Sequence, residues 1–305
     1  MSVTHAIAHN TFRESIRQPV YWAVVILTAS LMMLSVVFAG FALGEESKIV
    51  RDAGLTSITI AGLLLAMFLS SSVVADEIEK KTALSVLCKP VHRHQFILGK
   101  YIGILCSIVI AYILLSFILY GTVWWYETPT RYGLYLKSWW ANIPIDPQLL
   151  PAESQDLAKT PITTSVLFST FSSDISSFIR LVFPNLLAGV FLSLCEVAVL
   201  ASAALAVSTR VSMILNVCIS LSLFILGHQI GYLTHILSAG GEPGFIATLV
   251  RRIVPNFEFL NYASDIAFGK IIPITLIEEL TIYTVGWVAV FLAFAVLLFR
   301  EREIA

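Results

Sequence analysis

The sequence predicts an all-α membrane protein whose chain crosses the bilayer six times. Apolar residues make up 57% of its 305 residues, and charged residues only 13%. The mean hydropathy of +0.85 is far above that of ordinary soluble domains. The apolar residues also gather in six long runs. A helix of roughly 20 such residues crosses a hydrocarbon core about 30 Å thick, because it satisfies every backbone polar group internally.

Each run is long enough for one spanning helix. The first three and the last contain no charged residue, whereas the fourth contains Glu196 and the fifth contains His228. An ionisable side chain at membrane depth is costly, so it usually faces a bundle interior or an aqueous cavity. The predicted spans of this single transmembrane domain are 20–43, 55–75, 101–125, 186–208, 213–233 and 280–299.

Basic residues set the predicted orientation, since loops on the cytoplasmic side keep an excess of Lys and Arg. Placing the amino terminus in the cytoplasm puts ten of the 19 basic residues into short inner segments, and both termini are then cytoplasmic. The ten residues are Arg13, Arg17, Lys80, Lys81, Lys89, Arg93, Lys100, Arg210, Arg300 and Arg302.

Three segments lie outside in this topology: 44–54, 126–185 and 234–279. The second begins with a cluster of Trp and Tyr residues, which is typical of an aromatic belt at the headgroup level. The third is rich in Phe and Ile but too short and too polar to cross the membrane. It is therefore either re-entrant or an ordered surface loop, and its length favours neither alternative.

The chain before the first span is predicted to form an amphipathic helix along the inner membrane face. Ala8, Phe12 and Ile16 recur at helical spacing and make an apolar stripe.

The inner segment 76–100, between the second and third spans, also carries a helical pattern. Leu84, Leu87 and Cys88 follow the spacing i, i+3, i+4 after an acidic start at Asp76, and Pro90 supplies a stop. For an arbitrary membrane protein, such a loop would merely fix the topology and lie on the lipid headgroups.

Particular residues give this segment a more specific interpretation. The run Glu77-x-Glu79-x-x-Thr82, then Lys89-Pro90-x-x-Arg93, then Gly99-Lys100-Tyr101-x-Gly103, resembles the same loop in permease subunits of ABC transporters of the type-2 exporter (ABC-2) class. The similarity is greatest to the subgroup associated with multicopper-enzyme maturation. Shorter matches are Asn10 to Pro19, Gly227-His228, Val254 to Phe257 and Phe299 to Glu303. The outer segment 126–185 is longer and more aromatic than this family leads us to expect.

The resemblance implies an exporter permease in the inner membrane of a bacterium. A cytoplasmic ABC ATPase, carrying ATP and Mg, would be a separate partner, and a second permease copy or paralogue would complete a dimer. The residues that the resemblance assigns to ATPase coupling are Asp76, Glu77, Glu79, Lys80, Thr82, Leu84, Leu87, Lys89, Pro90 and Arg93.

The sequence contains no recognisable motif for nucleotide binding, metal binding or catalysis. A phosphate-binding loop needs Gly-Lys followed by Ser or Thr, but Tyr101 follows Gly99-Lys100 and Ile271 follows Gly269-Lys270. His92-x-His94 offers two metal ligands where a site needs more. We therefore expect no catalytic residue, metal or cofactor in this chain. The net charge of −1 gives no reason to expect nucleic acid, and membrane lipids are the remaining expected partners.

Glu196, His228 and Asn216 are the candidate pathway residues in the spans. The alternative is a structural role, in which Glu196 bonds to Asn216 or Ser220 of the neighbouring span. A rival function is a proton-coupled secondary transporter that uses Glu196 and His228, although its spans lack matched Gly- or Pro-interrupted pairs. An intramembrane enzyme would need a convergent catalytic constellation, and the spans contain none.

Overall fold

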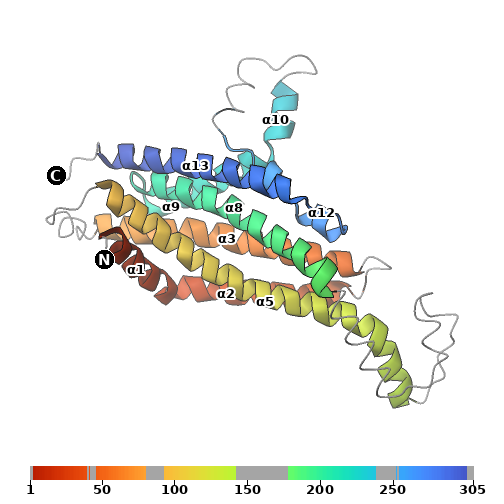
Figure 1. The fold of residues 1–305 in the computed structure, drawn as a ribbon. Coiled ribbons are helices and arrows are strands. Elements are labelled where there is room, and N and C mark those ends of the chain that lie inside the picture. Colours follow the sequence, from red (N-terminus) through yellow and green to blue (C-terminus); the bar gives the residue numbers. More distant parts are fainter. Residues whose placement is uncertain are drawn as a thin grey trace.

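The computed structural model describes residues 3–39, 41, 46–79, 93–141, 178–237, 252 and 254–300. Over these residues the fold is a helical bundle in which α2, α3, α5, α8 and α13 run alongside one another (Figure 1). The elements are α1 (Val3–Arg17), α2 (Pro19–Ala39), α3 (Glu46–Glu79), α5 (Arg93–Ala141), η3 (Phe178–Val182), α8 (Phe183–Ser208), α9 (Met213–His228), α10 (Ile230–Leu237), η4 (Glu258–Leu260), α12 (Ala263–Ala267) and α13 (Ile274–Arg300).

Four of the six predicted spans lie wholly within described helices, and a fifth, 20–43, lies within α2 as far as Ala39. Five helices are long and apolar enough to cross a membrane. These helices are α2, α3, α5, α8 with η3 before it, and α13. The remaining predicted span, 213–233, is not one continuous helix, because α9 ends at His228 and the chain turns before α10. The Gly227 carbonyl accepts a hydrogen bond from the Phe257 N–H at 3.1 Å. In a continuing α-helix, this carbonyl would instead accept from the N–H four residues later.

Helix α8 forms the centre of the bundle and packs against α3 and α13. Its buried positions include a series of small side chains, among them Ala201, Ala204 and Ser202. Small residues allow helix backbones to approach closely, which is how helices associate in lipid, where hydrophobic burial supplies little attraction between them.

One end of the bundle gathers segments that are far apart in the sequence. The Phe96 ring near the start of α5 stacks on Phe299 near the end of α13, with centroids 5.7 Å apart. In the turn between α8 and α9, Arg210 Nε donates a hydrogen bond to the Leu298 carbonyl at 3.1 Å. Helix α1 lies at the same end (Figure 1). The arrangement agrees with the prediction that these segments lie on one side of the membrane.

Helix α1 forms as predicted, but its buried face differs from the predicted apolar stripe. Its fully buried residues are Thr11 and Ser15, and the helix packs against α5. A Cβ added at Gly103 of α5 would lie 2.6 Å from Thr11 Cβ and 2.7 Å from the Ala8 carbonyl oxygen. The two helices therefore touch almost backbone to backbone, and α1 is docked on protein through small residues.

Two helices extend beyond the spans predicted for them. Helix α5 continues from the predicted end at residue 125 to Ala141, so the first part of the predicted outer loop is helical. It contains Pro129, and its axis bends toward its carboxyl end (Figure 1). Helix α3 continues to Glu79, which places the acidic residues from Asp76 onward at its end rather than at the start of a new helix. Residues 142–177, with the Pro-rich stretch, lie outside the described residues.

Candidate functional site

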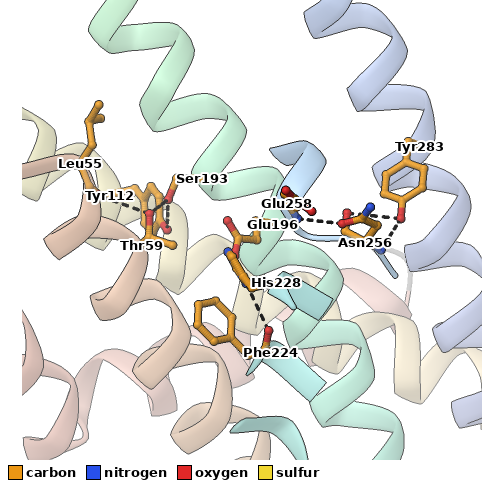
Figure 2. A network of polar contacts seen from close by, with 10 residues as sticks. All are labelled: Leu55, Thr59, Tyr112, Ser193, Glu196, Phe224, His228, Asn256, Glu258 and Tyr283. Carbon is orange, nitrogen blue, oxygen red and sulfur yellow. Dashed lines mark hydrogen bonds and ion pairs between the residues drawn. The ribbon is translucent and has the colours of Figure 1, made fainter. Parts of the chain in front are cut away.

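Polar side chains from three helices and the segment after α10 meet where α9 ends (Figure 2). Helix α8 supplies Glu196, α9 supplies His228 and α13 supplies Tyr283. Asn256 and Glu258 come from residues 254–272, which we call the return segment. Glu196 and His228, the two ionisable residues predicted for the spans, therefore lie in the same place.

The carboxylate of Glu196 and the imidazole of His228 are in contact. Glu196 is only 2% exposed, and its Oε1 lies 3.3 Å from His228 Nε2. The other ring nitrogen, Nδ1, lies 3.2 Å from the Phe224 carbonyl, which can only accept, so Nδ1 carries a hydrogen. The contact at Nε2 is then attractive in two states. Either the carboxyl group of Glu196 is protonated and donates to Nε2, or the imidazole ring is protonated and Nε2 donates to the carboxylate. The two side chains form a close polar contact at 3.3 Å.

Two aromatic rings, whose centroids lie 6.3 Å apart, pack against the imidazole. The His228 ring centroid lies 4.4 Å from that of Phe224 and 5.9 Å from that of Phe257. Phe257 also packs against Gly227, where an added Cβ would lie 2.9 Å from the Pro255 carbonyl oxygen. Gly227-His228 and Val254 to Phe257, two short motifs distant in the sequence, therefore form one packed unit.

The return segment is inserted into the bundle. The Asn256 N–H donates to the Tyr283 hydroxyl at 2.7 Å, and the Glu258 N–H donates to Asn256 Oδ1 at 3.0 Å. Phe257, Leu260 and Ile266 are buried at 0%, 1% and 1% exposure. These buried residues pack the return segment against the bundle, and its re-entrant course stays a prediction.

Asn216 is not a partner of Glu196. Its Nδ2 donates to Ser71 Oγ at 2.7 Å, and its Oδ1 accepts a long bond of 3.5 Å from Ser220. The alternative in which Asn216 or Ser220 bonds to Glu196 is wrong, because Asn216 bonds to Ser71 of α3 and Ser220 bonds to Asn216 within α9. Asn216 is 0% exposed, which gives it a place in helix packing.

A second polar cluster, which sequence reasoning did not predict, joins α3, α5 and α8 beside the first. Ser193 Oγ lies 2.8 Å from Thr59 Oγ1 and 2.9 Å from the Tyr112 hydroxyl (Figure 2). Hydroxyl residues are common in spanning helices, so only the position of Ser193, one turn before Glu196, could have singled it out.

The comparison with protein families decides what kind of protein this is. The model of the ABC-2 family of transporter proteins matches residues 5–304, nearly the whole chain. The chain belongs to the ABC-2 transporter family. A search of curated proteins finds no match to it. As a family member it is a membrane permease component of an ABC transporter, embedded in a membrane and not itself an enzyme. Membership does not favour the proton-coupled secondary transporter.

Within this ABC-2 permease, few of the predicted coupling residues lie in described parts of the chain. Asp76, Glu77 and Glu79 belong to the end of α3, and Arg93 is the first residue of α5. The two helices thus frame the segment on both sides. Its other predicted coupling residues lie outside the described residues, and their role stays a prediction: Lys80, Thr82, Leu84, Leu87, Lys89 and Pro90.

Proposed function

We propose that this ABC-2 permease is the membrane subunit of a bacterial inner-membrane exporter that a separate cytoplasmic ABC ATPase drives. The family match over residues 5–304 carries this proposal. In the proposed orientation, the bundle end that gathers α1, the end of α3 and the start of α5 faces the cytoplasm. The basic residues Arg13, Arg17 and Arg210 belong to that end, as the positive-inside rule requires.

The ATPase contacts residues 76–93 in this proposal, and ATP and Mg bind to the ATPase alone. A push on this segment passes into α3 and α5, because its two ends are the end of one helix and the start of the other. Both helices reach the buried cluster of Thr59, Tyr112 and Ser193 in the bundle. From there α8 carries the displacement to Glu196, one turn further along.

A second permease copy, or a paralogue, completes the proposed transporter. The pathway for the substrate would form between the two permeases, with Glu196 and His228 as its buried polar feature. Ionisable groups at membrane depth are usually functional, and the contact between them keeps both partnered in the resting bundle.

Substituting alanine for Glu77, Glu79 and Leu84 together is expected to reduce the amount of bound ATPase by at least about tenfold, equal to roughly 1.4 kcal/mol. The change removes two carboxylates and one leucine side chain from the proposed contact. The measurement is co-purification, in detergent, of the tagged permease with the ATPase encoded beside it.

Alanine at both Glu278 and Glu279, exposed near the opposite end of α13, makes a matched control that also removes two carboxylates. This control is expected to retain the ATPase. Equal recovery with the wild type and the triple variant would refute the proposed contact, and no ATPase with either form would remove support for the exporter.

A further inference from the structure

An apolar groove runs along α13 and shares Tyr283 with the polar cluster described above. Its volume is about 680 Å³. Three aromatic rings one turn apart form its floor: Tyr283 and Trp287 have centroids 6.4 Å apart, and Trp287 and Phe291 stack at 5.5 Å. Only 17% of the apolar window of α13 is buried, so this face of the helix is open to whatever surrounds the bundle.

Arg252 is the one charged residue that lines this groove. Its side chain is exposed, and the other described lining residues are apolar or aromatic, so none of them supplies a carboxylate to neutralise it. The groove begins at Ile282, close to the amino-terminal boundary of the predicted span 280–299, and continues to Phe294 deep within it. A cation beside hydrocarbon is costly without an anion. The groove therefore presents an unneutralised cation next to a long apolar surface.

Tyr283 fixes the cation in relation to the groove. Its ring belongs to the aromatic floor, while its hydroxyl accepts the Asn256 N–H at 2.7 Å. Asn256 follows Arg252 by four residues. Through this bond, the segment that carries Arg252 is tied to the amino-terminal half of α13.

We propose that this groove binds an anionic phospholipid, with the phosphate on Arg252 and one acyl chain along Tyr283, Trp287 and Phe291. A guanidinium matches the geometry of a phosphate, and basic pockets beside spanning helices recognise lipid headgroups. The aromatic floor alone would suit any apolar partner. The Arg252 guanidinium at the groove favours a partner that combines an anionic group with a long apolar chain, as an anionic phospholipid does. The site depends on membrane embedding and not on ATPase coupling, so each proposal can fail without the other.

Quenching of tryptophan fluorescence by brominated lipids tests this site, because Trp287 lies on its floor. The whole chain is reconstituted in phosphatidylcholine vesicles containing a fixed minor fraction of phosphatidylglycerol, with bromine on the acyl chains of one lipid or the other. The quenching that disappears in Trp287→Phe reports the groove. In the wild type we expect phosphatidylglycerol to be preferred at Trp287 by about fivefold.

Arg252→Gln is expected to abolish this preference, and Arg252→Lys to retain most of it. Arg180→Gln, which removes an exposed cation next to α8, is the matched control and should behave as the wild type. A preference that survives in Arg252→Gln would overturn the proposal. So would a wild-type Trp287 that neither lipid quenches, which is the result expected if a second copy of the chain covers the groove.

Gly286→Leu provides a test that does not depend on Arg252. No atom lies within 4 Å of a Cβ added at Gly286, and the residue lines the groove. Leucine should fill the groove without disturbing the bundle and thereby remove the quenching by both lipids. Gly121→Leu is the matched control, since an added Cβ there also meets no atom within 4 Å. Unchanged quenching in Gly286→Leu would refute the site.

Discussion

Replacing Gly103 with leucine is expected to release α1 from α5 and to lower the free energy of unfolding by about 3 kcal/mol. A Cβ at this position would lie 2.7 Å from the Ala8 carbonyl oxygen, which is backbone and cannot rotate away. The helices must therefore separate, and the contacts around Thr11 and Ser15 are lost with them. Few other substitutions in the chain place a side chain so directly against another helix backbone.

Two measurements check the release of α1. Trypsin should remove an amino-terminal tag faster in Gly103→Leu, because Arg13 and Arg17 lie on a helix that the bundle no longer holds. Thermal unfolding in detergent should shift to lower temperature. Gly121→Leu is again the control, and its stability should stay the same or rise slightly, since leucine favours helix over glycine by about 1 kcal/mol. Equal protease resistance in both variants would contradict the docking of α1.

Glu196→Ala is expected to destabilise the bundle by about 3 kcal/mol, because it leaves a cavity in α8 and removes the partner of His228 Nε2. Glu196→Gln should cost far less. The amide can donate to Nε2 or accept from it, so glutamine replaces the lost contact in either protonation state of the ring. The difference in unfolding free energy between the alanine and glutamine variants therefore measures the effect of the side chain at position 196 beyond the small loss that glutamine causes.

A double-mutant cycle measures this contact directly. The costs of Glu196→Ala and His228→Ala, obtained from chemical unfolding in mixed micelles, should sum to more than the cost of the double variant, with a coupling of about 1–3 kcal/mol. Asn216→Ala is a useful comparison. It breaks a separate bond to Ser71, so its effect should add to that of Glu196→Ala without coupling. Additive costs for Glu196 and His228 would show that the two side chains do not interact.

The spans could be predicted because lipid imposes one rule on every crossing segment: about 20 apolar residues in a continuous helix. The exception shows the limit of that rule. The apolar run 213–233 reads as one span, yet α9 ends at His228, where the Gly227 carbonyl bonds to Phe257. This bond comes from a segment some thirty residues later, so hydropathy along the chain cannot reveal it. Tertiary contact overrides the local pattern.

The docking face of α1 could not be predicted for a related reason. A hydrophobic stripe is read from polarity, whereas α1 docks through Thr11 and Ser15, which are small rather than apolar. The informative signal was the spacing of Gly99 and Gly103, four residues apart on one face of α5. In the sequence, these glycines otherwise stand out only as part of the motif that resembles the ABC-2 family.

Of the candidate site, the individual residues could be predicted but not their pairing. Glu196 and His228 stand out because ionisable groups are rare in apolar runs. Their contact depends on the axial register between α8 and α9, which the sequence does not specify. Thr59, Tyr112 and Ser193 could not be distinguished from the many other hydroxyl residues in the spans.

The length of α5 has a mechanical consequence. At 1.5 Å per residue, its 49 residues extend for roughly 70 Å, whereas a bilayer with its headgroups is about 40–45 Å thick. Part of the helix must therefore project beyond the bilayer. A tilt of only about 10° about the midpoint would swing each end through roughly 6 Å by the same geometry. Helix α5 would then act as a lever that converts a displacement at the end near α1 into a displacement of similar size at residues 126–141 at its other end.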